Sequence, residues 1–158
     1  MDGAPFAASG RLGARKTHTL PGSVKSWPVG LLLDGPWTEY FQKLLWVEGS
    51  GDLAAAYHFA VPAGNWLPVA MLGASVKQLH PEAIQWLRGK QVRMVPHVDA
   101  AGHAAIERWG TLLEKLGCAV DVFELGGLCR ANGTPVKDLN DCTELLPEHR
   151  AEMEGLLK

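Results

Sequence analysis

Short apolar runs alternate with helix-like segments along most of this chain, and that alternation limits the folds open to it. Four runs have the length and composition of buried strands, at 44–47, 69–72, 92–98 and 119–125. Helical segments are expected between and after them, at 52–59, 81–87, 102–116 and 142–157. Strands that alternate with helices predict an α/β fold of the Rossmann-like kind, with a mainly parallel sheet of about four strands and helices on both faces.

The N-terminal region differs in composition from the rest. Residues 1–35 read as an irregular basic arm with a short strand at 29–33, and residues 36–158 as one α/β domain with a C-terminal helix. The arm carries Arg11, Arg15, Lys16 and Lys25 against a single acid before Asp34. The whole chain has a formal net charge of −2, so it lacks the basic excess of a stand-alone nucleic-acid binder. General phosphate affinity is expected only in the arm, and a solvated flexible end is the alternative.

Cysteine usage and hydropathy bear on the compartment. The three cysteines, Cys118, Cys129 and Cys142, are odd in number and lack CxxC spacing, so they fit neither a disulfide framework nor a zinc knuckle. A reducing, cytoplasmic compartment is therefore expected. No apolar run approaches the length of a membrane span, and no membrane partner is expected.

Polar side chains gather where the expected strands end. Glu48 follows the first strand, His97 and Asp99 end the third, and the run 137–141 (KDLND) precedes the last helix. In a parallel α/β sheet the loops at the carboxyl ends of the strands form the ligand crevice. If the first and third strands are neighbours, Glu48 and Asp99 face one crevice. In extended geometry His97 and Asp99, two residues apart, point to the same side and could reach one ion.

Clustered carboxylates repel one another, and a hard cation such as Mg²⁺ is the usual way to stabilise them. Each residue also has a structural explanation on its own. Glu48 could be a surface or capping group, Asp99 could cap the helix that contains Gly102, and His97 could be a hydrogen-bonded structural histidine. Asp138 and Asp141 could cap and flank the last helix. Only the joint placement of these residues at strand ends favours a metal site. From the residues alone, a metal site and a set of separate structural roles are about equally favoured.

A competing motif overlaps the first cluster. Residues 49–54 (GSGDLA) match the G-x-G-x-x-A dinucleotide fingerprint between a strand and a helix. That fold also needs an acid about 20 residues later for the ribose. No acid follows until Glu82, and Glu48 and Asp52 would place negative charge beside a pyrophosphate. A nicotinamide or flavin site is therefore the weaker hypothesis.

The order of these motifs resembles the Toprim family, which includes primases, topoisomerases and several nucleases. Residues 44–52 resemble its strand ending in Glu-Gly, in the primase-like form that continues to an aspartate. Residues 92–102 resemble its D-x-D-x-x-G element, and 133–141 are similar to the third acidic element of primases from phages and mobile elements. The resemblance covers roughly residues 40–145, and it implies a Toprim domain over 36–158.

The resemblance also implies site roles. Glu48 would be the general acid/base and line the metal site, with Asp99 a metal ligand. Asp138 with Asn140 or Asp141 would bind a second ion, and Lys137 would steady a phosphate. His97 departs from the family, because it stands where the first aspartate of D-x-D belongs. An imidazole is a softer ligand, which shifts the expected cofactor from Mg²⁺ toward Mn²⁺ or similar ions.

The function implied is metal-dependent nucleotidyl transfer in a primase-like DNA replication protein, acting on single-stranded DNA and nucleotides. The protein partners implied are a helicase or the remaining primase domains, because the chain has no zinc module or basic polymerase subdomain. Two alternatives remain: a Toprim nuclease that cleaves phosphodiesters, and a non-catalytic Toprim module that docks a replicative helicase.

Overall fold

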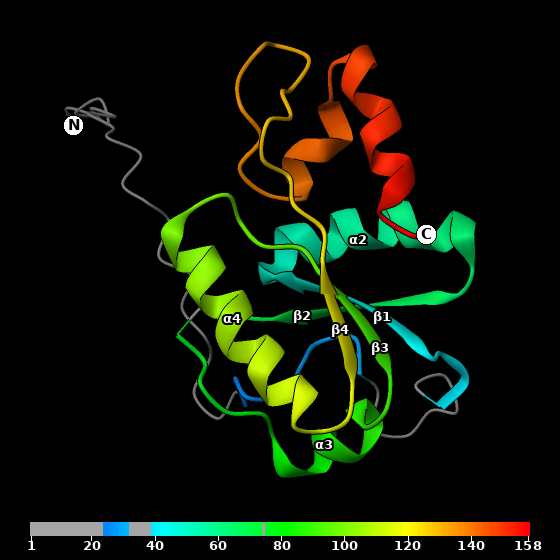
Figure 1. Cartoon of the computed structure of the whole chain (residues 1–158), viewed down its shortest axis with the longest axis vertical. Helices are drawn as coiled ribbons and strands as arrows, with labels where there is room; N and C mark the ends of the chain where they lie inside the picture. The colour runs from blue at the N-terminus through cyan, green and yellow to red at the C-terminus, as the bar shows by residue number, and fades with distance from the viewer. Residues whose placement is uncertain (1–23, 32–38, 74) are drawn as a thin grey trace, which may run out of the picture.

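One four-stranded parallel sheet organises the molecule (Figure 1). The computed structural model describes residues 24–31, 39–73 and 75–158. The strand order is β2-β1-β3-β4, and every neighbouring pair is parallel. The strands are β1 (Lys43–Glu48), β2 (Trp66–Met71), β3 (Gln91–Met94) and β4 (Ala119–Val122). The predicted α/β fold is confirmed. The first and third strands are neighbours, so their carboxyl ends lie side by side.

Helices cover both faces of the sheet, as predicted. On one face lie α3 (Pro81–Leu87) and α4 (Ala100–Glu114), packed on apolar side chains of β1, β2 and β3. On the other face lie α2 (Gly49–Ala63) and the C-terminal segment, which bury the alternate side chains of β1 and β2 together with Val95. Leu44, Leu45, Trp46 and Val47 of β1 are all fully buried, because successive strand residues point to opposite faces and both faces are covered.

Two strands end earlier than expected. The predicted strand over 92–98 stops at Met94, although Val95 still donates its amide to the carbonyl of Trp46 at 2.9 Å. Pro96 then offers no amide proton to continue the ladder, so His97 and Asp99 leave the sheet. The predicted extension of this strand to residue 98 is therefore wrong, and the argument from strand geometry for His97 and Asp99 does not apply. Strand β4 likewise ends at Val122 rather than residue 125.

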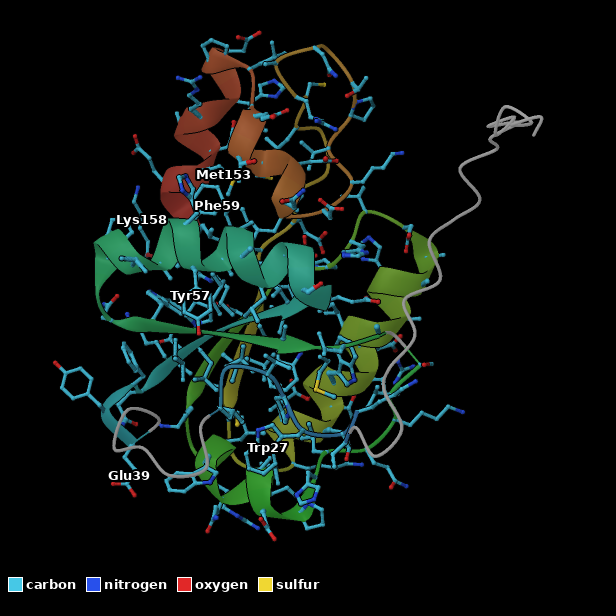
Figure 2. All side chains as sticks on the ribbon, turned by 180° about the vertical axis from the view of Figure 1, so that it is seen from behind. Trp27, Glu39, Tyr57, Phe59, Met153 and Lys158 are labelled. Atoms are coloured by element: carbon cyan, nitrogen blue, oxygen red, sulfur yellow. The ribbon has the colours of Figure 1, made fainter. Side chains whose placement is uncertain are left out.

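The C-terminal region is not the α-helix predicted for 142–157. Two 3₁₀ helices occupy it, η1 (Asn140–Glu144) and η2 (Pro147–Gly155), with extended residues between them. Pro147 disfavours helical geometry at Leu146, whose φ and ψ are −53° and 143°. Figure 2 shows Met153 of η2 beside Phe59, where this segment rests on α2.

The described part of the N-terminal region, residues 24–31, runs along the free edge of β2. Val29 forms a single antiparallel bridge with Ala70 instead of the predicted strand. A Cβ on Gly30 would lie 2.3 Å from the carbonyl oxygen of Pro68, so this close approach requires glycine. The basic residues before Lys25 and the end of the expected strand, Leu32 and Leu33, lie outside the described residues. Within the described ranges no helix combines the length and apolar character needed to cross a membrane.

Candidate metal centre

Asp52, His97 and Asp138 converge at the carboxyl ends of β1 and β3. Asp52 lies in the first turn of α2, His97 in the loop between β3 and α4, and Asp138 in the segment that precedes η1. One candidate ligand atom from each residue lies within 4.8 Å of the other two. Two carboxylates and an imidazole at this spacing could hold a metal ion.

Asp52 is placed by the turn between β1 and α2. Gly49 has a φ of 83°, which lets the chain leave β1 at Glu48 and enter the helix directly. One turn later the Asp52 carboxylate is buried, with only 3% of the residue exposed. Its Oδ2 lies 2.7 Å from Nε2 of His97, and its Oδ1 accepts a hydrogen bond of 3.0 Å from the amide of Asn140. The carboxylate thus joins three segments that are far apart in the sequence.

The acids around His97 hold its imidazole in the charged form. The hydrogen bond to Asp52 raises the pKa of His97 to about 9, against the opposing effect of burial. The charges of Asp52, Glu48 and Asp138 raise the pKa further. A protonated imidazole has no lone pair for a metal, so an ion bound at this centre must replace that proton. Metal affinity at the centre is therefore coupled to pH.

This pKa shift predicts how the stability of the metal-free protein depends on pH. The pKa of His97 is about 9 in the folded chain and 6.5 ordinarily, so its stabilising contribution is complete below about pH 6.5. The contribution is then lost as pH rises through 9. We expect the free energy of unfolding to fall by about 1–3 kcal/mol over that window, with some screening at this partly exposed side chain. Urea unfolding at several pH values measures this fall in the free energy of unfolding. His97→Gln should remove this part of the pH dependence, and identical curves for both proteins would contradict the assignment.

The segment carrying Asp138 is fixed by an ion-pair network. Burial raises the pKa of Asp138, and the Asp141 amide opposes the rise by donating a 3.0 Å hydrogen bond to its Oδ1. The Asp141 carboxylate accepts from the amide of Lys137 and forms a 3.0 Å ion pair with Arg130. Arg130 also contacts Glu144 at 2.9 Å. Asp141 therefore shapes the turn that presents Asp138 to Asp52.

Asp99 caps the helix that follows it. Its Oδ1 accepts a 2.7 Å hydrogen bond from the amide of Gly102, which makes Asp99 the N-cap of α4. Capping by aspartate satisfies a helix amide that otherwise lacks a partner. The capping explanation thus describes the carboxylate in this structure, and Asp99 is outside the group formed by Asp52, His97 and Asp138.

Two substitutions separate capping from metal binding at Asp99. Asp99→Ala should lower the free energy of unfolding of the metal-free protein by about 1 kcal/mol, since the cap is lost. Asp99→Asn should be nearly neutral, because asparagine caps helices as well as aspartate does. Both variants should keep Mn²⁺ affinity within a few-fold of the unsubstituted chain. Urea unfolding and Mn²⁺ titration test this, and loss of Mn²⁺ binding in Asp99→Asn would identify Asp99 as a ligand.

The remaining predicted residues lie near the centre but do not belong to the group formed by Asp52, His97 and Asp138. Glu48 is half-buried at the end of β1, near enough for its charge to raise the pKa of His97. No hydrogen bond joins its carboxylate to another described residue. The exposed Asn140 contributes its backbone amide, and Lys137 is also exposed. Of the six predicted metal ligands, only His97 and Asp138 belong to the group.

Sequence reasoning missed Asp52. It is not among the six metal ligands that the sequence analysis predicts. A signal was present nevertheless, because the motif resembling Toprim continues from Glu48-Gly49 to this aspartate. Comparison of the chain with protein-family models, with curated proteins and with solved structures found no match.

Proposed function

We propose that this chain is a Toprim-like domain of a primase-like DNA replication protein, and that it transfers nucleotidyl or phosphoryl groups with the help of a divalent cation. The observation that carries the proposal is the convergence of Asp52, His97 and Asp138 beside Glu48 at the carboxyl edge of a parallel sheet. That edge is where α/β folds bind their ligands.

The two carboxylates and the imidazole fit a divalent metal ion such as Mg²⁺ or Mn²⁺. Asp52 and Asp138 supply oxygens, which suit both Mg²⁺ and Mn²⁺, while His97 supplies a nitrogen that Mn²⁺ accepts more readily. When bound, such an ion polarises a phosphate and stabilises the charge that develops on its oxygens. Asn140 contributes to the same site by holding Asp52 in place through its amide. We therefore expect Mn²⁺ to bind more tightly than Mg²⁺.

Glu48 is the candidate for moving a proton. Its half-buried carboxylate lies beside the three ligands, and no described residue holds it by a hydrogen bond. It is therefore available to accept the proton of an attacking hydroxyl group. The exposed ammonium of Lys137, next to Asp138 in the sequence, would steady the phosphate from the solvent side.

Calorimetric titration with Mn²⁺ and Mg²⁺ is the first test, followed by assays on single-stranded DNA with nucleoside triphosphates. We expect Mn²⁺ binding to weaken strongly in Asp138→Asn, whereas Glu48→Gln should bind Mn²⁺ but lose turnover. Glu107→Gln on the exposed face of α4 is a control that should change neither Mn²⁺ affinity nor turnover. Template-directed incorporation indicates a primase, and strand scission indicates the nuclease alternative. Absence of binding at millimolar Mn²⁺ would contradict the proposal.

One observation favours a second candidate, a non-catalytic module that docks a helicase. The 2.7 Å contact between His97 and Asp52 satisfies the buried carboxylate without any metal. If that pair is purely structural, Asp138→Asn and Glu48→Gln will leave helicase binding intact while no metal binds.

A further inference from the structure

A hollow beside the free edge of β2 is lined by two lysines and by no acid. It measures about 590 Å³ and lies between the segment 24–26 and the loop 75–78 that follows β2. Lys25 enters from the first segment and Lys77 from the second, and Ser26, Ser75 and Gln78 supply further polar groups. Every charged side chain that lines the hollow is therefore a cation. This lining suits an anionic ligand.

Neither lysine is neutralised by the described part of the chain. No salt bridge joins Lys25 or Lys77 to a carboxylate among the described residues, and both side chains are exposed. Arg130, by contrast, is already bound to Asp141 and Glu144. The two ammonium groups thus remain available to a phosphate from solution.

The hollow has a fixed frame. The carbonyl of Ser26 accepts a 2.9 Å hydrogen bond from the amide of His80, which ties the N-terminal segment to the start of α3. The carbonyl of Val76 accepts from the indole of Trp109 at 3.1 Å, which ties the loop to α4. Figure 2 marks this end of the molecule by Trp27, whose ring lies 5.4 Å from that of His80. Both lysines therefore project from anchored backbone.

The loop that lines the hollow is connected to the edge of the sheet that carries the candidate metal centre. The loop 75–78 follows the carboxyl end of β2, and Met71 at that end is in register with Glu48 of β1. The centre itself is strongly acidic, with Glu48, Asp52, Asp138 and Asp141 nearby. A nucleic-acid strand that reaches the centre needs cations beside it to offset the repulsion between those acids and its phosphates.

We propose that the hollow between Lys25 and Lys77 binds backbone phosphates of a single-stranded nucleic acid whose reacting end lies at the metal centre. The proposal rests on the proposed function for its choice of ligand. It adds a binding site, formed by the N-terminal segment and the loop after β2, that sets the direction in which the strand leaves the centre. Each lysine neutralises one phosphate, and the serine hydroxyls donate hydrogen bonds to the phosphate oxygens.

Fluorescence anisotropy with a labelled oligothymidylate, in EDTA so that no metal contributes, tests the proposal. The double variant Lys25→Ala/Lys77→Ala should bind about tenfold more weakly than the unsubstituted chain. The slope of log affinity against log salt should shrink by about 0.7 per lysine. Lys25→Arg/Lys77→Arg should retain both values. A charge control, Lys115→Ala/Lys158→Ala, removes the same formal charge from exposed positions outside the hollow, although Lys158 forms a 3.8 Å ion pair with Glu154, and it should change the affinity much less.

Equal losses in the two alanine pairs would overturn the proposal, because they would show a general charge effect. Competition by ATP that depends on both lysines and displaces the oligonucleotide would also overturn it, in favour of a site for free nucleotides. The outcome is separable from that of the metal titration. If the lysine substitutions weaken oligonucleotide binding but no Mn²⁺ binds, the proposed function is contradicted and the phosphate site in the hollow is retained. If Mn²⁺ binds but the lysine substitutions have no effect, the phosphate site is contradicted and the proposed function is retained.

Discussion

Replacing Asp52 with asparagine is expected to weaken Mn²⁺ binding by about 100-fold or more. Loss of a residue that only orients a metal ligand already costs about 10- to 100-fold, and Asp52 is a candidate ligand itself. Its carboxylate is also the largest cause of the raised pKa of His97. The pKa of His97 should therefore fall toward its ordinary value in the variant. Calorimetry measures the affinity, and NMR titration of the imidazole measures the pKa.

Asparagine is nearly isosteric with aspartate, so the fold should survive this change. The new amide oxygen can still accept the hydrogen bond that the Asn140 amide donates to Oδ1. A suitable control is Asp121→Asn, which breaks a carboxylate–guanidinium pair with Arg93 at 2.6 Å, away from the candidate centre. That control should lose stability but keep its Mn²⁺ affinity. Wild-type affinity in Asp52→Asn would remove Asp52 from the centre.

Gly102→Ala should destabilise the fold by about 2–3 kcal/mol, the upper part of the range for overpacking. A Cβ at this position would lie 2.5 Å from the carbonyl oxygen of His97 and 2.8 Å from its Cβ. Backbone cannot yield as the end of a flexible side chain can, so either α4 or the His97 loop must shift. Because His97 Nε2 lies only 2.7 Å from Asp52, that shift should also weaken Mn²⁺ binding.

Gly110→Ala on the same helix is the matched control. A Cβ there would meet Met94 Sδ at 3.8 Å and Val120 Cγ1 at 3.9 Å, which are ordinary contacts. Alanine is the better helix former, so this variant should gain about 0.5–1 kcal/mol. Urea unfolding measures both variants, and Mn²⁺ titration compares their centres. A Gly102→Ala protein as stable as Gly110→Ala would show that the close approach to His97 is not a constraint.

The close approach at Gly102 also explains part of the motif that suggested a metal site. Asp99 and Gly102 stand three residues apart because the carboxylate caps the amide of Gly102, while the missing side chain makes room for His97. The three-residue spacing of Asp99 and Gly102 therefore both caps the helix and makes room for His97. From the sequence alone, a cap and a metal ligand at Asp99 were both possible. The hydrogen bond of 2.7 Å favours the cap.

The amino-acid sequence by itself determined the succession of elements and the layers. Apolar runs such as 44–47 are local signals, and their fully buried side chains follow from strands covered on both faces. The same reasoning placed Glu48 and His97 at one edge of the sheet. Local pattern was less informative at the C-terminus, where Pro147 divides two 3₁₀ helices that an apolar count cannot distinguish from one α-helix.

Only the tertiary structure decided which side chains meet. Asp52 contacts His97 across 45 residues of sequence and the Asn140 amide across 88, and such pairings depend on how elements pack rather than on spacing. Asp52 alone is an acid in a first helical turn, where the helix dipole favours negative charge. Burial between α2, the His97 loop and the segment that carries Asp138 makes it the central carboxylate of the candidate site. The physical reason is that local periodicity encodes an element, whereas a site requires three separate segments to be fixed by long-range contacts.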